Sequence, residues 1–192
     1  MIADKLAQVH ARIASACEAA GRPVESVTLL AVSKTFDANA VAAAHAAGQR
    51  LFGENYVQEA LAKIAALAEL APRPEWHLIG PVQTNKTRIV AETFDWVHAI
   101  DRLQVAERLS AQRPPTLAPL SVCVQVNVSG EASKHGVSPA EALPLALHVS
   151  TMGSIRLRGI MGIPEATGDS YRLRAQFRTL KRCLDACADA GL

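Results

Sequence analysis

Strand-like and helix-like segments alternate along most of this 192-residue chain, and this alternation limits its possible folds more than any other feature. An introductory helix is predicted over residues 2–17, where apolar residues recur at helical spacing. Six βα units follow, which indicates parallel strands joined by right-handed crossovers. The predicted strands cover residues 27–33, 50–53, 76–80, 96–100, 120–128 and 155–163.

Capping residues mark the starts of several predicted helices. Asp37 opens a helix that stops near residue 48, and Ser138 with Glu141 forms a capping box. Thr84 and Asp101 are predicted to cap the helices that follow the third and fourth strands. The helix after the second strand is expected to bury a stripe made of Val57, Leu61, Ile64 and Ala68.

Two architectures fit this order of elements, an open doubly wound sheet and a (β/α)8 barrel. A dinucleotide-binding sheet needs a glycine-rich turn after its first strand, whereas residues 33–36 contain no glycine. A barrel needs eight strands and typically ~250 residues. The doubly wound interpretation is weakened by the missing glycine-rich turn. The barrel interpretation lacks two strands, because the chain supplies only six.

Lys34 closes the first predicted strand and stands directly before a helix start. The carboxyl ends of parallel strands are where α/β proteins bind their ligands. Partial burial there would favour the neutral amine, which is the form that condenses with an aldehyde. The alternative is an ordinary lysine that reaches into solvent from the strand end.

Other polar or functional side chains also lie at strand ends. Such residues are Glu54, Asn55, His77, Gln83, Asn85, Lys86, His98, Asp101, Asn127, Ser129 and Met161. His77 and His98 could equally be core histidines, and Asp101 a plain helix cap. Lys134 lies in the small, polar segment 129–136, which is expected to be either a mobile loop at the barrel mouth or a solvated surface loop.

Bulk properties exclude several classes of function. A net charge of +2 with scattered basic residues disfavours a nucleic-acid partner. No apolar stretch is long enough to span a bilayer, and the N-terminus does not read as a signal peptide. The four cysteines have neither zinc-site spacing nor the density of a disulfide scaffold, and Cys183 and Cys187 are expected to be reduced thiols near the core. A cytoplasmic, soluble protein is expected.

Six short segments together resemble the YggS/PROSC family of pyridoxal 5′-phosphate (PLP) homeostasis proteins. They are AVSKT at 31–35, FGENYVQE at 52–59, WHLIG at 76–80, QTNK at 83–86, VQVN at 124–127 and LRGIMGIP at 157–164. The resemblance implies a (β/α)8 TIM-type barrel like the N-terminal domain of alanine racemase. It also implies PLP held as a Schiff base on Lys34, without established turnover, for buffering or delivery to apo-enzymes.

The same resemblance extends to further site residues. Asn55, His77 and Met161 are expected to line the PLP pocket, and Lys134 to have a part in cofactor handling. A monomer or weak homodimer is expected, with no metal.

The chain also departs from the family pattern. Family members continue into two more segments, which supply the phosphate cradle and an arginine facing the pyridine nitrogen. The expectation is therefore one PLP-binding barrel domain over residues 1–192 that is C-terminally incomplete, with about six βα units and strands seven and eight missing. Weaker PLP binding, and low stability or self-association through the open edges of the first and sixth strands, are expected to follow.

Two other functions stay open. One is a PLP-dependent racemase or decarboxylase, although the acid–base group that related racemases take from a second domain has no counterpart in this chain. The other is a binding or regulatory module without a cofactor.

Overall fold

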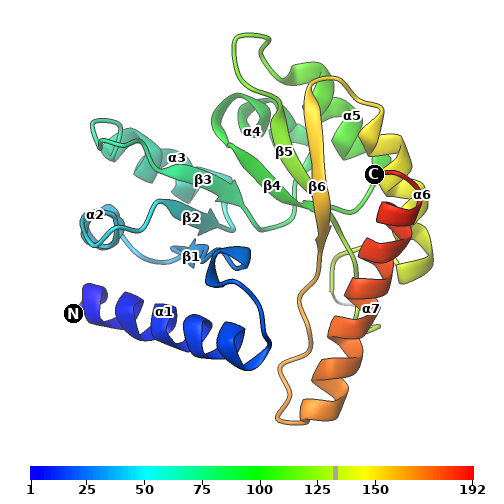
Figure 1. Ribbon diagram of the computed structural model, residues 1–192. Coiled ribbons are helices and arrows are strands. Elements are labelled where there is room, and N and C mark those ends of the chain that lie inside the picture. Colours follow the sequence, from blue (N-terminus) through cyan, green and yellow to red (C-terminus); the bar gives the residue numbers. More distant parts are fainter. Residues whose placement is uncertain (132–133) are drawn as a thin grey trace. The chain divides into compact units, whose positions relative to one another are not determined.

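The computed structural model describes residues 1–131 and 134–192. Six strands alternate with helices in the predicted order (Figure 1), and the order of strands in the sheet follows the sequence from β1 to β6. The pairs β1–β2, β4–β5 and β5–β6 are parallel. This α/β arrangement with a parallel six-stranded sheet confirms the predicted partial TIM-type fold. The chain forms two compact units, Met1–His77 and Leu78–Leu192, which are described in turn.

The first unit consists of an introductory helix and the first strands with their helices. Its elements are α1 (Ile2–Ala19), a 3-10 turn η1 (Val24–Ser26), β1 (Ala31–Val32), α2 (Ala38–Ala46), β2 (Leu51–Glu54), α3 (Val57–Ala66) and β3 (Glu75–Leu78), the last residue of which begins the second unit. Asp37 caps α2 as predicted, since its carboxylate accepts a hydrogen bond from the Ala40 amide at 2.8 Å. Phe52 and Trp76 are almost fully buried and pack with their ring centroids 5.8 Å apart.

The second unit carries the remaining strands. Its elements are η2 (Thr84–Lys86), α4 (Thr87–Thr93), β4 (Trp96–Ile100), α5 (Leu103–Gln112), β5 (Leu120–Gln125), α6 (Pro139–Ser150), β6 (Ile155–Met161) and α7 (Ser170–Asp189). Val97, Val122 and Val124 are fully buried, as expected for parallel strands covered on both faces. The Arg113 guanidinium donates to the carbonyls of Ala91 and Phe94 at 2.6 and 2.8 Å, which supplies partners for buried backbone oxygens.

Four predicted strands are longer than those in the structure, the third by a single residue, since β3 covers Glu75–Leu78 instead of 76–80. Strand β1 contains only Ala31 and Val32 of the predicted range 27–33, because it lies at the edge of the sheet and pairs with the short β2 alone. Strand β5 stops at Gln125 instead of residue 128, and β6 stops at Met161 instead of 163. Beyond Gln125 the Val126 amide still donates to the Met161 carbonyl of β6, and Val126 also forms an isolated bridge with Val137.

Two predicted helix caps are wrong. Thr84 begins the 3-10 turn η2, and α4 itself starts at Thr87. Asp101 precedes the N-cap of α5, which is Arg102, and the Asp101 carboxylate accepts from the Arg102 guanidinium at 2.9 Å instead of from backbone amides. The capping box of Ser138 and Glu141 at the start of α6 is confirmed.

The buried stripe of α3 also differs from the prediction. Ala60, Lys63 and Leu67 are buried, whereas Ala68 is exposed and the other predicted members are only half-buried. All four cysteines are free and buried, which confirms reduced thiols near the core. Within the described residues, none of the helices has both the length and the apolar character required to cross a membrane.

Candidate functional site

Lys34 and Asn55 leave neighbouring strands at the same edge of the first unit. Val32 of β1 is in register with Gly53 of β2, and the Ser33 amide extends the pairing by donating to the Gly53 carbonyl at 2.9 Å. Lys34 and Asn55 each lie two residues beyond the last registered pair. Because the strands are parallel, both residues emerge at the carboxyl end of the pair, as the sequence predicts.

The side chains of the strands in the first unit point alternately to the two opposite faces of the sheet. Phe52 and Glu54 alternate with Gly53 and lie on the face that α3 covers, because Lys63 of α3 contacts Glu54. Trp76 packs against Phe52 and shares that face. His77 alternates with Trp76 and therefore lies on the opposite face of the strands, together with Gly53.

The environments of the three predicted residues differ. Lys34 is exposed, Asn55 is half-buried and His77 is buried. The expected partial burial of Lys34 is wrong, because the chain turns directly after Ser33, where the Phe36 amide donates to the Ser33 carbonyl at 3.1 Å. The imidazole Nε2 of His77 lies 2.9 Å from a carboxylate oxygen of Glu75.

A buried polar network lies directly beside Lys34. The Lys63 ammonium donates to the Glu54 carboxylate and to the Ser33 carbonyl, both at 2.7 Å. The Ser33 hydroxyl donates to the same Glu54 oxygen at 2.6 Å. Lys63 was not among the predicted site residues, because the stripe expected from the large apolar residues of α3 does not include the face on which Ala60 and Leu67 are buried.

The second unit places Met161 and Lys134 near the end of β5. Met161 is in register with Gln125, and its carbonyl accepts from the Val126 amide at 2.8 Å. The Asn127 side-chain amide donates to the carbonyls of Glu131 and Lys134 at 2.8 and 3.2 Å. The segment that carries Lys134 is therefore tied to the end of β5 on both sides of residues 132–133, which lie outside the described residues.

Two contacts with acidic side chains also involve this segment. The Lys134 ammonium lies 2.8 Å from the Glu131 carboxylate, and the hydrogen bond it donates lowers the pKa of Glu131 below its ordinary value. The imidazole of His135 lies 3.9 Å from the Asp101 carboxylate. Asp101, directly after β4, thus approaches the segment that follows β5 within this unit, which differs from the predicted role as a cap.

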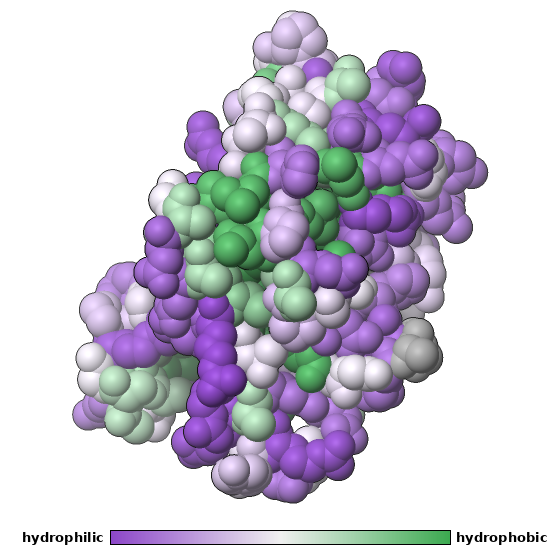
Figure 2. Space-filling model, turned by 90° about the vertical axis from the view of Figure 1, so that its right-hand side faces the viewer, coloured by the Kyte–Doolittle hydropathy of each residue, from purple (hydrophilic) through white to green (hydrophobic). Residues whose placement is uncertain are grey.

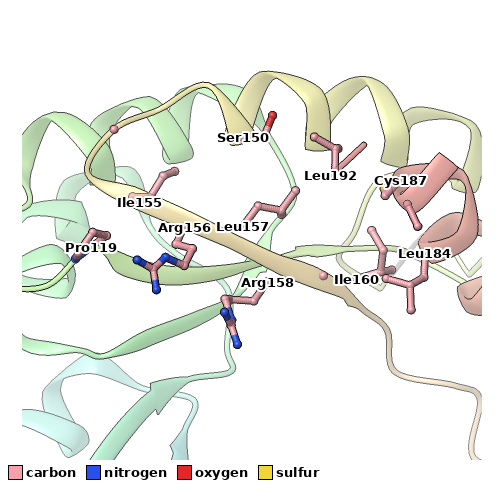
Figure 3. A pocket seen from close by; sticks show the side chains of 13 residues that line it. Pro119, Ser150, Ile155, Arg156, Leu157, Arg158, Ile160, Leu184, Cys187 and Leu192 are labelled. Atoms are coloured by element: carbon pink, nitrogen blue, oxygen red, sulfur yellow. The ribbon is translucent and has the colours of Figure 1, made fainter. Parts of the chain in front are cut away.

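A pocket of the second unit lies away from the strand ends at which the site is predicted. It has a volume of about 360 Å³ and is lined by β6 from its first residue, Ile155, and by α7 residues such as Leu184 and Cys187. Figure 3 shows the side chains of Leu157 and Leu184 at this hollow, and Arg156 and Arg158 also line it. Figure 2 shows apolar side chains gathered on the face that carries α7. Because Met161 at the carboxyl end of β6 does not line it, this pocket is distinct from the predicted site.

Known proteins resemble this chain over nearly its whole length. The family model for the N-terminal domain of alanine racemase matches residues 5–192. The pyridoxal phosphate homeostasis protein of Pseudomonas aeruginosa is 56% identical over 183 residues, which cover 95% of this chain and 79% of that protein. The protein of the same name from Escherichia coli is 50% identical over 192 residues, covering 100% of this chain and 80% of its own length.

Solved structures of the same family and fold also resemble this chain. PipY of Synechococcus elongatus, a structure with PLP bound, is 34% identical with a TM-score of 0.84, and the match covers 99% of this chain and 83% of PipY. An alanine racemase from Clostridium difficile has a TM-score of 0.65 at 14% identity, covering 84% of this chain and 44% of the racemase, and shows the shared fold alone. From the matched family model and these relatives, the chain belongs to the YggS/PROSC family, the pyridoxal phosphate homeostasis proteins, whose fold is that of the alanine racemase N-terminal domain.

Proposed function

We propose that this protein binds PLP covalently and reversibly through Lys34 and acts in PLP homeostasis without catalytic turnover. The observation that carries the proposal is the position of the Lys34 amine, exposed at the carboxyl end of β1 beside a buried network that fixes the preceding residue. The PLP-bound structure of PipY supports the choice of ligand.

The residues of the first unit fit this chemistry. Lys34 would hold the cofactor through its amine, and the cofactor would supply an electrophilic aldehyde that can condense with an amine, with loss of water. Adding water back reverses this condensation, so an exposed amine suits both capture and release. Asn55 offers an amide to hydrogen-bond the cofactor, and the imidazole of His77 offers a flat surface against its ring.

The second unit is proposed to contribute less directly. Met161 would line the site, and Lys134 would take part in cofactor entry or exit from a segment that Asn127 holds in place. Reversible binding would allow transfer of PLP to apo forms of PLP-dependent enzymes in the cytoplasm, by a monomer or a weak homodimer.

A titration with PLP tests the proposal. We expect an absorbance band near ~420 nm, a wavelength set by the chemistry of the cofactor. Lys34→Ala should weaken binding, whereas Lys181→Ala, which removes an exposed lysine of α7, should leave binding unchanged. Equal PLP affinity for wild type and Lys34→Ala would refute the assignment of Lys34.

A further inference from the structure

We infer that Lys63 and Glu54 are positioning residues for Lys34, holding the backbone on which its amine is carried. The inference rests on the proposed binding of PLP to Lys34, and it assigns a role to two buried charged groups of the first unit. Neither group needs to touch the cofactor.

The contacts converge on Ser33, the residue directly before Lys34. Its carbonyl accepts from the Lys63 ammonium at 2.7 Å, its hydroxyl donates to Glu54 at 2.6 Å, and its amide donates to the Gly53 carbonyl at 2.9 Å. Every polar group of Ser33 is therefore engaged, and the peptide that leads into Lys34 is fixed from three directions.

Helix α3 also contacts the residue on the other side of Lys34. The Thr35 amide donates to the Glu59 carboxylate at 3.4 Å, and Glu59 lies one helical turn before Lys63. Thr35 has a φ of 67°, a conformation that is strained for a β-branched residue and persists only when its surroundings enforce it. The same helix thus holds both neighbours of Lys34, while the Lys34 side chain itself is exposed.

A contribution to folding stability does not by itself explain the buried network of Lys63, Glu54 and Ser33. A buried ion pair often contributes no more than well-packed apolar residues of similar volume, because both charges lose their hydration. Glu54 is fully buried, and within the described residues its second carboxylate oxygen has no hydrogen-bond partner. A network that is costly to bury but specific in geometry is typical of a functional site whose reactive group must be held in place.

The network also distinguishes the two lysines near the edge of β1 and β2. The Lys63 ammonium is buried and donates to Glu54 and Ser33, so its nitrogen is covered by protein atoms. Lys34 is accessible to an aldehyde from solution. Lys63 therefore positions the backbone that leads into Lys34, and Lys34 is the lysine that would react with PLP.

A double variant, Lys63→Met with Glu54→Gln, tests the inference without leaving a buried charge unpaired. The control is Lys181→Met with Asp185→Asn, which removes an exposed lysine–carboxylate pair of α7. The first readout is hydrogen exchange at residues 33–37 in the absence of PLP, and the second is PLP affinity. Circular dichroism establishes that each variant is folded.

We expect faster exchange at residues 33–37 and PLP affinity reduced by roughly tenfold or more, because binding to a site that is no longer held in place must also order its backbone. The control should change neither readout. Glu59→Ala, a change at an exposed residue, should speed exchange at Thr35 and serves as the second variant if the double variant does not fold.

The two proposals fail in different ways. If wild type binds no PLP at Lys34, the proposed function is wrong, whatever the exchange data show. If wild type binds PLP but the folded double variant keeps its affinity, with or without faster exchange, the positioning role is wrong. Unchanged exchange at residues 33–37 in the double variant, or at Thr35 in Glu59→Ala, also overturns it.

Discussion

Cys123 is a buried thiol on β5 whose ionisation is coupled to folding. Burial raises its pKa to about 11, although the nearby Arg158 guanidinium acts in the opposite direction. Burial also raises the pKa values of Cys183 and Cys187. Burial therefore favours the neutral form of these three thiols in the folded protein.

We predict a loss of stability in alkaline solution that depends on Cys123. Its folded-state pKa is raised above the ordinary value of 9.0, so its contribution is complete below about pH 9 and is lost as the pH rises toward 11. The loss should be on the order of 2 kcal/mol. Urea unfolding at pH 8 and pH 10.5 measures it, and Cys123→Ala should show a smaller difference between the two pH values. An equal difference in both proteins would contradict the assignment to Cys123.

The neighbourhood of Lys34 and Asn55 could be predicted because the sequence shows where their two strands end. Parallel strands bring Lys34 and Asn55 to one edge whatever the lengths of the strands, so their neighbourhood follows from the βα pattern. Lys63 was missed because the buried face of α3 was predicted from its large apolar residues, whereas the face that packs carries Ala60 and a paired lysine. Which helical face packs is decided by tertiary contacts that periodicity does not contain.

Glycine at position 136 is required by the way the Lys134 segment packs on β5. Gly136 has a φ of +119°, and a Cβ there would lie 2.6 Å from the Asn127 amide nitrogen and 2.8 Å from the Val126 carbonyl carbon. Those atoms belong to backbone that is paired with Val137, so they cannot move cheaply.

We predict that Gly136→Ala destabilises the second unit by about 2 kcal/mol through backbone strain and displaces the Lys134 segment. Chemical denaturation measures the first effect, and the rate of Lys134 acetylation, followed by mass spectrometry, measures the second. Gly168→Ala is the matched control, because a Cβ at that position meets no atom within 4 Å. Similar stability for the two variants would contradict the packing described for Gly136.

Element boundaries were predictable where local chemistry decides them. The capping box of Ser138 and Glu141 begins α6 as expected, since the contacts that define it lie within four residues. The first strand was predicted too long, because apolar residues can form a strand only where a partner strand exists, and β2 offers β1 two registered positions. Strand length is thus a property of the sheet more than of the segment.

At the scale of the whole molecule, the strand order leaves β1 and β6 at the two ends of the sheet. Unpaired backbone groups on edge strands are prone to pair with another chain. Beside β6, Leu184 of α7 is 44% exposed and lines the apolar hollow shown in Figure 3.

We predict that the protein self-associates as its concentration rises, and that Leu184→Lys reduces this association. The charge would stand on the apolar surface beside β6 and oppose burial against a second copy. Sedimentation velocity over a range of concentrations measures the effect, with Gln8→Lys, an exposed change on α1, as a control of equal charge. A single monomeric species at every concentration would contradict the prediction.

The fold class was predictable because six βα units in sequence leave few topologies, and the parallel pairs confirm it. A single PLP-binding domain over residues 1–192 and a cytoplasmic location stay predictions. The resemblance to PLP homeostasis proteins came from short motifs spread along the chain, and the identity of 56% and 50% to two such proteins confirms it.

The central claim, that Lys34 is the residue that binds PLP, can be tested on the unmodified protein. Incubation with PLP followed by reduction with borohydride converts the C=N bond into a stable secondary amine, and mass spectrometry of the peptides then locates it. We predict that at substoichiometric PLP the pyridoxyl group is found on the peptide that contains Lys34. A group found mainly on Lys63, Lys134 or scattered surface lysines would contradict the account.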